Sequence, residues 1–515
     1  MESDIHANLL SLDGRPLSLG EIESVAANGR QVAVTPEALA RVDESRRVIE
    51  SILRAGETVY GVNTGFGKLA DVSIPAERLA QLQTNLVRSH ACGLGEPLSE
   101  AETRAMLLLR ANVLAKGFSG VRRELLELLV AMLNAGVHPV VPAKGSVGAS
   151  GDLAPLAHLA LVVLGEGEAV FQGARMPGAE ALSRAGLMAL PLAAKEGLAL
   201  LNGTQAMTGV GALSVAEARR LVQIADLAGA MSLEALMGTP VAFDPRIHSA
   251  RPHAGQIASA AHLTGLLEGS PIRESHRSHS VDPRVQDAYC LRCMPQVHGA
   301  VRGVLEHVAS ILEIESGSAT DNPLVFAGRN DESNRSEAEV LSGGNFHGAP
   351  LSYAFDYAAI ALTDLASISE RRIDRLINPD INEGLPAFLC SDAGLSSGYM
   401  IAHVTAAALL NECKVLAHPS STDSVPTSGG KEDHVSMGMT GALKLRQVTE
   451  NLRLILAIEM LCAAQGLDFR LPLQPSPAVA KAHATVRALV PHLDEDRVPA
   501  PDIEAVAKAI QSRKF

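Results

Sequence analysis

The sequence predicts a mainly α-helical fold, with a bundle of long helices and a smaller, mixed N-terminal domain. Only 3 % of the residues are aromatic and Trp is absent, so Leu, Ala, Val and Ile must fill the core. Leu and Ala favour helices over strands. A chain of 515 residues is also too long for one hydrophobic core, since single cores stop growing at roughly 250–300 residues. We therefore expect an N-terminal domain at 1–200 and a helical bundle domain at 201–515.

Helix signals punctuate the first half of the chain. Thr35 and Pro36 are typical of an N-cap followed by the first helical position. Ser99 and Glu102 have capping-box spacing, and the helix that they open is expected to end at Gly117. A third helix is predicted over 121–135, with Gly136 as its stop.

Strand signals are short, and the long helices follow in the second half. We predict strands at 31–35, 59–62 and 168–173. Long stretches rich in Ala and Leu predict helices at 202–238, 353–377, 396–417 and 440–465. The polar stretches 270–287 and 327–345 are interpreted as loops.

Charge and hydropathy exclude several classes of partner. A net charge of −13 without any run of Lys or Arg argues against a nucleic-acid partner. The start MESDIHANLL does not resemble a signal peptide, and the apolar run 153–165 is shorter than the ~20 residues that span a bilayer. We expect a soluble, cytoplasmic protein with no membrane partner.

The six cysteines, at 92, 290, 293, 390, 413 and 462, are expected to be reduced thiols. Cys290 and Cys293 form a single CxxC pair without a second pair at zinc spacing. No metal site is expected.

The stretch GSVGASGDLAPLAH, at 145–158, places small residues before a predicted helix. If the backbone bends sharply, the amide nitrogen of Gly151 can attack the carbonyl carbon of Ala149 and close a five-membered ring. Loss of the Ser150 hydroxyl as a second water would leave a methylidene, which is a strong electrophile. Asp152 and Pro155 then open a helix whose positive end would favour developing negative charge. A helix-capping turn is the alternative interpretation of this stretch alone.

Seven further stretches, in the same order, accompany GSVGASGDLAPLAH. They are YGVNTGFG (60–67), LVRSHACGLG (86–95), LNGTQAM (201–207), QDAYCLRC (286–293), TDNPL (320–324), GGNFHG (343–348) and EDHVSM (432–437). Together they resemble the histidine and aromatic amino acid ammonia-lyases over essentially the whole chain. The resemblance implies that Ala149, Ser150 and Gly151 become a methylidene-imidazolone, with no external cofactor and no metal. It also implies a homotetramer whose active sites combine loops from three subunits.

The resemblance assigns further residues to this site. Tyr60 is an acid/base candidate on a Gly-rich turn, Asn202 binds beside the prosthetic ring, and Phe346 packs against it. Gln286, Tyr289 and Arg292 are three residues apart, which on a helix would place them on one face. There Arg292 would clamp the substrate carboxylate, Tyr289 would act on the β-proton, and Gln286 would orient its neighbours. His347 is interpreted as structural.

Two positions bear on the substrate. Ser89-His90 matches the pair that histidine lyases carry, and the carboxylate of Glu432 suits an imidazole N–H. Lys431 departs from the glutamine that the family usually has before this Glu, which puts local contacts in doubt more than the substrate. We therefore expect elimination of ammonia from L-histidine to give trans-urocanate. Whether the substrate's amine or its imidazole ring attacks the prosthetic group stays open.

Two alternatives remain. A tyrosine or phenylalanine lyase or an aminomutase of the same family is the nearer one, and Ser89-His90 and Glu432 argue against it. A non-catalytic helical scaffold that binds an anion at a helix start is the other.

Overall fold

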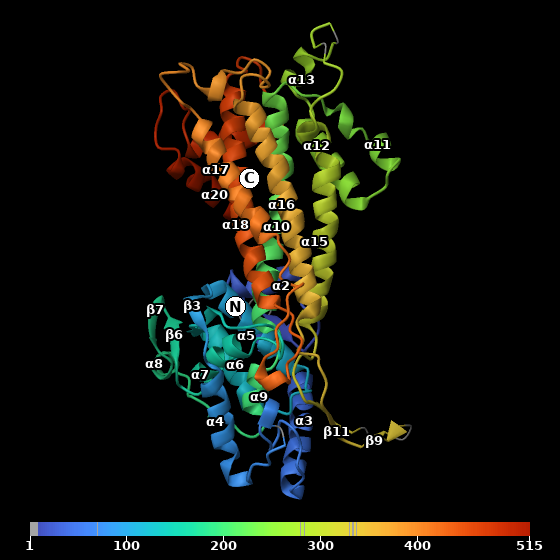
Figure 1. Cartoon of the computed structure of the whole chain (residues 1–515), viewed down its shortest axis with the longest axis vertical. Helices are drawn as coiled ribbons and strands as arrows, with labels where there is room; N and C mark the ends of the chain where they lie inside the picture. Colours follow the sequence, from blue (N-terminus) through green and yellow to red (C-terminus); the bar gives the residue numbers. More distant parts are fainter. Residues whose placement is uncertain are drawn as a thin grey trace, which may run out of the picture. The chain divides into compact units, whose positions relative to one another are not determined.

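Helices build most of the chain, and the computed structural model confirms the mainly α-helical fold (Figure 1). The structure describes residues 9–69, 71–278, 280–282, 284–328, 330–331, 334–335 and 337–515. Within these ranges the strands are short and form one three-stranded and four two-stranded sheets. None of the helices in the same ranges is both long enough and apolar enough to span a membrane.

The chain forms two compact units, each assembled from separate stretches of sequence. Unit 1 comprises Met1–Ala216, Ala309–Phe355 and Pro419–Leu443, and unit 2 comprises Glu217–Val308, Asp356–His418 and Lys444–Phe515. The divisions fall inside four long helices, which are α10 (Gln205–Ala235), α15 (Met294–Ser316), α16 (Ala349–Ile377) and α18 (Gly438–Asp468). The sequence analysis, by contrast, divides the chain once, after residue 200.

Unit 1 combines short helices with all of the described strands. Its helices, apart from the ends of the long ones, are α2 (Leu19–Ala26), α3 (Pro36–Ala55), α4 (Leu79–His90), α5 (Glu100–Ala115), α6 (Arg123–Ala135), α7 (Leu153–Val163), α8 (Gly178–Arg184) and α9 (Glu196–Leu201), with the 3₁₀ turns η1 (Gly67–Leu69), η2 (Ala76–Arg78) and η5 (Ser428–Gly430). Its strands are β1 (Leu10–Leu12), β2 (Val32–Val34), β3 (Leu94–Pro97), β4 (His138–Pro139), β5 (Pro142–Lys144), β6 (Glu168–Phe171), β7 (Ala174–Pro177), β8 (Leu324–Phe326), β9 (Asn330–Asp331), β10 (Asn334–Arg335) and β11 (Glu339–Leu341). Only β1 and β2 pair in parallel.

The helix signals of the first half are confirmed, because each depends on groups within one turn. The Thr35 side chain accepts a hydrogen bond from Ala38 N at the start of α3. The capping box of Ser99 and Glu102 opens α5, and Gly136 ends α6 in the left-handed conformation.

Of the three expected strands, two are confirmed and one is wrong. β2 covers 32–34, and β6 continues through a tight turn into β7. Residues 59–62 form a turn instead. There the Asn63 side chain accepts a hydrogen bond from Val59 N at 2.9 Å and donates one to Glu57 O at 2.8 Å. These local bonds replace the pairing that a strand would need.

Unit 2 consists of helices, and its long ones lie side by side in Figure 1. Besides the larger parts of α10, α15, α16 and α18, it contains η3 (Pro240–Phe243), α11 (Pro245–Ser249), α12 (Ala254–Leu267), α13 (Pro271–Ser275), α14 (Tyr289–Arg292), η4 (Ala387–Leu389), α17 (Met400–Leu416), α19 (Pro477–Leu489) and α20 (Ala500–Gln511). The four long helices expected here from their Ala and Leu content are thereby confirmed as α10, α16, α17 and α18.

The core of unit 2 surrounds α18. From Ile455 to Gln465 every side chain on this helix is fully buried, which is typical of a helix enclosed on all sides. Glu459 is among them, and its carboxylate pairs with the buried Arg372 at 2.6 Å. Ser232 and Ser369 donate further hydrogen bonds to it, so this buried charge is fully paired.

Helix α15 and parts of the two expected loops differ from the sequence prediction. The segment 294–316 carries polar residues and glycines between its apolar positions, which hides its helical period. Within 270–287 the chain forms α13, and within 327–345 it forms β9, β10 and β11. Ser270 caps α13 through a hydrogen bond from Arg273 N, a signal that the polar composition conceals.

Candidate active site

A cavity of about 690 Å³ in unit 1 brings together most of the residues that the sequence analysis singles out. Its lining includes Tyr60, His90, Ala149, Ser150, Asn202, Phe346 and Glu432. They come from the turn after α3, the end of α4, the loop before α7, the end of α9 and two later loops. Chain segments up to hundreds of residues apart therefore face one space.

The backbone at Ala149-Ser150-Gly151 packs against the loop that follows α9. Gly151 has a φ of +75°, and a Cβ there would lie 2.1 Å from Gly203 O. Asn202 Nδ2 donates a hydrogen bond to Ser150 O at 2.8 Å, and Asp152 N donates one to Gly203 O at 2.7 Å. Position 151 must therefore be glycine for the two loops to approach so closely.

Asp152 precedes α7, but its side chain does not cap that helix. Its carboxylate instead accepts hydrogen bonds from Ser146 Oγ at 2.8 Å and from Met207 N at 2.9 Å. Burial raises the pKa of Asp152 to about 6 even though these hydrogen bonds oppose the shift. The side chain thus ties the loop of 146–152 to the start of α10.

Ser150 and Glu432 are in direct contact. The Ser150 hydroxyl donates to Glu432 Oε1 at 2.5 Å, and Thr427 Oγ1 donates to Glu432 Oε2 at 2.6 Å. Burial alone would raise the pKa of Glu432, but hydrogen bonds from Ser150, Thr427 and Ser428 bring it below its ordinary value. Glu432 is therefore an ionised acceptor beside the serine at neutral pH.

Tyr60 lies on the same cavity, on the turn that replaces the expected strand. Burial raises the pKa of its phenol, and the negative charge of Glu432 raises it further, against a backbone hydrogen bond with Gly67. The phenol is consequently protonated at neutral pH and is suited to donate a proton.

His90 ends α4 with its ring held at one nitrogen. Its Nδ1 lies 2.8 Å from Leu86 O and 3.1 Å from Ser89 Oγ. Because Leu86 O can only accept, Nδ1 carries the proton. Nε2 of a neutral ring is then an acceptor.

Phe346 and His347 follow one another along the wall of the cavity. The ring of His347 stacks on that of His434 with centroids 5.9 Å apart, and its Nε2 lies 3.2 Å from His434 O. His347 thereby joins the loop that carries Phe346 to the loop that carries Glu432.

Arg110 supports the site from behind, and the sequence analysis missed it. Its guanidinium, fully buried, donates to Asn202 O at 3.0 Å and Ala199 O at 2.9 Å, and it also contacts Gln205 Oε1. Burial lowers the pKa of Arg110 to about 10, so it is still charged. The available signal was a lone arginine inside the apolar run MLLLRANVLA.

Gln286, Tyr289 and Arg292 belong to unit 2 and not to the lining of this cavity. The expectation that one helix face carries all three is wrong, because α14 begins only at Tyr289 and Gln286 lies in a bend before it. Tyr289 and Arg292 do meet, with the guanidinium 4.6 Å from the ring centroid. The Tyr289 side chain is 70 % exposed.

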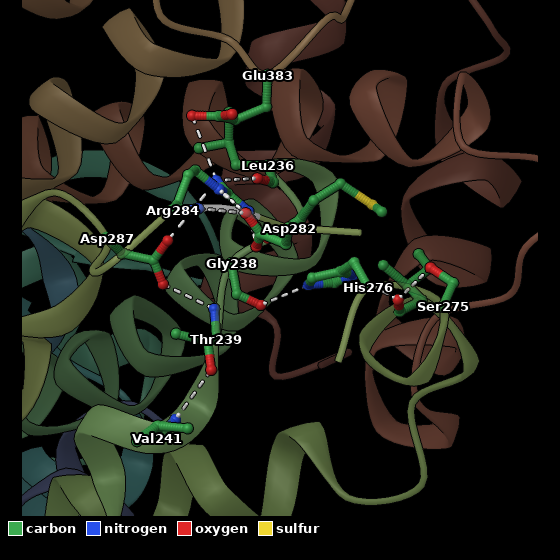
Figure 2. A network of polar contacts seen from close by, with 12 residues as sticks. Leu236, Gly238, Thr239, Val241, Ser275, His276, Asp282, Arg284, Asp287 and Glu383 are labelled. Carbon is green, nitrogen blue, oxygen red and sulfur yellow. Dashed lines mark hydrogen bonds and ion pairs between the residues drawn. The ribbon is translucent and has the colours of Figure 1, made fainter. Parts of the chain in front are cut away.

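A polar network around Arg284 anchors the segment before α14 (Figure 2). The Arg284 guanidinium pairs with Asp282 at 2.8 Å and with Glu383 at 3.3 Å, and it donates to the carbonyls of Leu236 and Met237. Asp287 accepts from Thr239 N at 2.7 Å. On the other side, Arg372 Nη1 reaches Cys290 O at 3.5 Å.

Metal ligands do not gather in the part of the chain that the structure describes. No group of three or more His, Cys, Asp or Glu side chains there could hold a metal ion. Cys290 and Cys293 are free thiols.

Comparison with known proteins agrees over the full length. Residues 17–488 match the model of the family described as aromatic amino acid lyase. A protein named histidine ammonia-lyase from Koribacter versatilis is 55 % identical over 510 residues, with 98 % of each chain covered. The crystal structure of histidine ammonia-lyase from Trypanosoma cruzi is 44 % identical with a TM-score of 0.89, covering 98 % of this chain and 94 % of that one. Tyrosine aminomutase from Streptomyces globisporus is 41 % identical with a TM-score of 0.92, covering 98 % and 97 %. The chain therefore belongs to the aromatic amino acid lyase family.

Proposed function

We propose that this chain is a histidine ammonia-lyase that eliminates ammonia from L-histidine to give trans-urocanate. The contact of 2.5 Å between Ser150 Oγ and Glu432 Oε1 carries the proposal, since it sets a carboxylate beside the future electrophile. An ionised carboxylate is the acceptor that an imidazole N–H prefers. Relatives named histidine ammonia-lyase, 51–56 % identical over nearly the whole chain, support the same substrate.

The prosthetic group of the proposal is a methylidene-imidazolone made from Ala149, Ser150 and Gly151. The residues fit it, because the bent backbone needs glycine at 151 and Asn202 already holds Ser150 O. Once formed, the group supplies an electrophile that assists the departure of the amine.

The other cavity residues divide the remaining tasks. Glu432 accepts the imidazole N–H, and His90 Nε2 offers an acceptor on the same cavity. The protonated phenol of Tyr60 donates a proton. Asn202 Oδ1 is buried without a hydrogen-bond partner in the described structure, and it would accept from the substrate's ammonium.

Gln286, Tyr289 and Arg292 would come from other copies of the chain in a homotetramer. Support comes from Tyr289, which is a large aromatic side chain left 70 % exposed next to Arg292. Apolar side chains on α16 and α17 are exposed as well, including Tyr357 at 50 %, Ile401 at 59 % and Val404 at 55 %. Such surfaces are typical of protein interfaces. In the assembled site Arg292 would bind the substrate carboxylate and Tyr289 would take the β-proton.

Intact mass and product analysis test the proposal together. We expect the purified chain to weigh two waters less than its sequence and to convert L-histidine to urocanate in preference to tyrosine or phenylalanine. Ser150→Ala cannot form the methylidene, so its activity should be nearly lost. A preference for tyrosine would favour the related lyases or aminomutases, and a chain that retains both waters would favour a scaffold without catalysis.

A further inference from the structure

The hydroxyl of Ser436 joins three separate segments directly behind the Ala149–Gly151 triad. Ser436 Oγ donates to Gly148 O at 2.9 Å, and Gly348 N donates to the same oxygen at 3.2 Å. Next to this contact, Met437 N donates to Val147 O at 2.8 Å. The carbonyl that precedes the triad is thus held by two donors from two different loops.

Ser436 is itself held in one orientation. Its side chain is buried, its Oγ accepts from Gly438 N at 3.2 Å, and its carbonyl accepts from Ser352 Oγ at 2.6 Å. Because the hydroxyl already accepts one hydrogen bond, its single proton is committed to Gly148 O.

The close approach requires a residue without a side chain opposite Ser436. Gly148 has a φ of +65°, and a Cβ at that position would lie 2.2 Å from Ser436 Oγ. A Cβ on Gly348 would lie 2.8 Å from the same atom. The small-residue stretch therefore has a second purpose besides the triad, which is to admit the hydroxyl of Ser436.

The consequence follows from the peptide planes. The plane between 148 and 149 is fixed by Ser436 and Gly348, and the plane between 150 and 151 is fixed by Asn202 Nδ2 on Ser150 O. The second plane contains the nucleophile, Gly151 N. Only the plane between these two, which carries the carbonyl carbon of Ala149, is left to turn toward that nitrogen.

Ring closure forms the bond from Gly151 N to Ala149 C. The carbonyl oxygen of Ala149 leaves as the first water with the protons of Gly151 N and Ser150 N, and a C=N bond remains. The second water takes the Ser150 hydroxyl and the proton on Ser150 Cα, which leaves the methylidene. Both steps need only groups of the triad.

We propose that Ser436 is a positioning residue for this ring closure, because it holds the first peptide plane so that Ala149 C meets Gly151 N. The inference rests on the proposed prosthetic group. A misplacement of reacting groups by about 1 Å can lower a rate by about 10²-fold. Ser436→Ala should therefore slow the loss of the two waters by at least about tenfold.

The experiment follows intact mass with time after synthesis or refolding of the full chain. Ser316→Ala is the matched control, because Ser316 is equally buried, accepts from Leu17 N at 2.7 Å and donates to Leu17 O at 3.1 Å, away from the triad. We expect Ser316→Ala to mature like the parent chain. We expect Ser436→Ala to accumulate chains that retain the waters, while urocanate formation per mature site falls far less than the fraction of mature sites.

Maturation of Ser436→Ala at the rate of Ser316→Ala would overturn the inference, as would full maturation with lowered turnover. If Ser436→Ala lacks a cooperative unfolding transition, Ser352→Ala decides instead, because it keeps the hydroxyl but frees the Ser436 backbone. Slower loss of water then supports the inference, and parental maturation rejects it. The parent chain separates this question from the proposed function. If it keeps both waters, the prosthetic group fails, and if it loses them but deaminates another amino acid, only the substrate is wrong.

Discussion

Ser150 and Glu432 are 282 residues apart in the chain, yet their side chains share one short hydrogen bond. The serine is the source of the electrophile in the proposed mechanism, and the carboxylate is the acceptor for the substrate's ring. Two other hydroxyls, from Thr427 and Ser428, keep Glu432 ionised. The charge at this single position therefore has a direct consequence for turnover.

Glu432→Gln tests that consequence at the residue scale. The amide keeps the shape of the side chain but loses the charge, and a hydrogen bond to a charged group is worth about 1.5–3 kcal/mol. We expect kcat/KM for L-histidine to fall by roughly 10- to 100-fold, measured from urocanate absorbance. Asp423→Asn is the control, because it makes the same charge change at an exposed position of the same loop. Equal effects of both variants would show that only net charge matters, and intact mass checks that both waters are lost.

At the scale of elements, α14 has only four residues and depends on its surroundings for its position. An isolated helix of one turn is not stable in water. The network around Arg284 supplies the missing restraint, since it ties the preceding segment to the end of α10 and to Glu383 (Figure 2).

Arg284→Met should therefore displace Tyr289 and Arg292 without affecting the triad. We expect kcat to fall by about 10- to 100-fold, while the intact mass still shows the loss of two waters. Arg277→Met is the control, because its pairing with Glu274 is exposed on the same segment. Unchanged kcat in Arg284→Met would contradict a role for the network in positioning α14.

The end of α10 also carries a buried carboxyl with a raised pKa. Burial raises the pKa of Glu234 to about 7, although its carboxylate accepts from Ser476 N at 3.0 Å. A raised pKa in the folded state stabilises the protein below the unfolded value near 4.5, and this stability is lost as the pH rises to about 7.

Glu234→Gln should remove this pH dependence, because glutamine can still accept from Ser476 N but cannot ionise. The variant should match the parent at pH 4.5 and exceed its unfolding free energy at pH 8 by up to about 3 kcal/mol. Thermal unfolding at both pH values measures the difference. A constant difference at the two pH values would show that Glu234 does not titrate in this range.

At the scale of the whole molecule, the candidate site divides into two sets of residues. The cavity residues belong to unit 1, whereas Gln286, Tyr289 and Arg292 belong to unit 2. The proposed tetramer would combine the sets from different copies of the chain.

Co-expression tests that arrangement. Ser150→Ala and Tyr289→Phe chains, each nearly inactive, should regain partial activity in mixed oligomers, because some sites would contain neither change. Ser150→Ala with Glu432→Gln is the control pair. These two side chains touch within one chain, so mixing should give no more activity than Glu432→Gln alone. No recovery with Tyr289→Phe in confirmed mixed oligomers would count against shared sites.

The agreement between sequence and structure depends on how far each interaction reaches along the chain. The caps at Thr35, Ser99 and Gly136 involve groups within a few residues, and all three were predicted. The turn at 59–62 was missed, although the signal of Asn63 was present in the sequence. Arg110 could not be assigned, because its acceptors at 199 and 202 are 89 and 92 residues away.

The sequence by itself determined the mainly helical fold, the caps and the triad, because helical period and hydrogen bonds within one turn are local. It also indicated the residues around the triad through their resemblance to the family. The tertiary structure alone decided that Glu432 touches Ser150, that Ser436 holds Gly148 O, and that α14 is a single turn anchored by Arg284. These contacts join segments whose separation along the chain carries no periodic signal, so only the packing of the folded backbone brings them together.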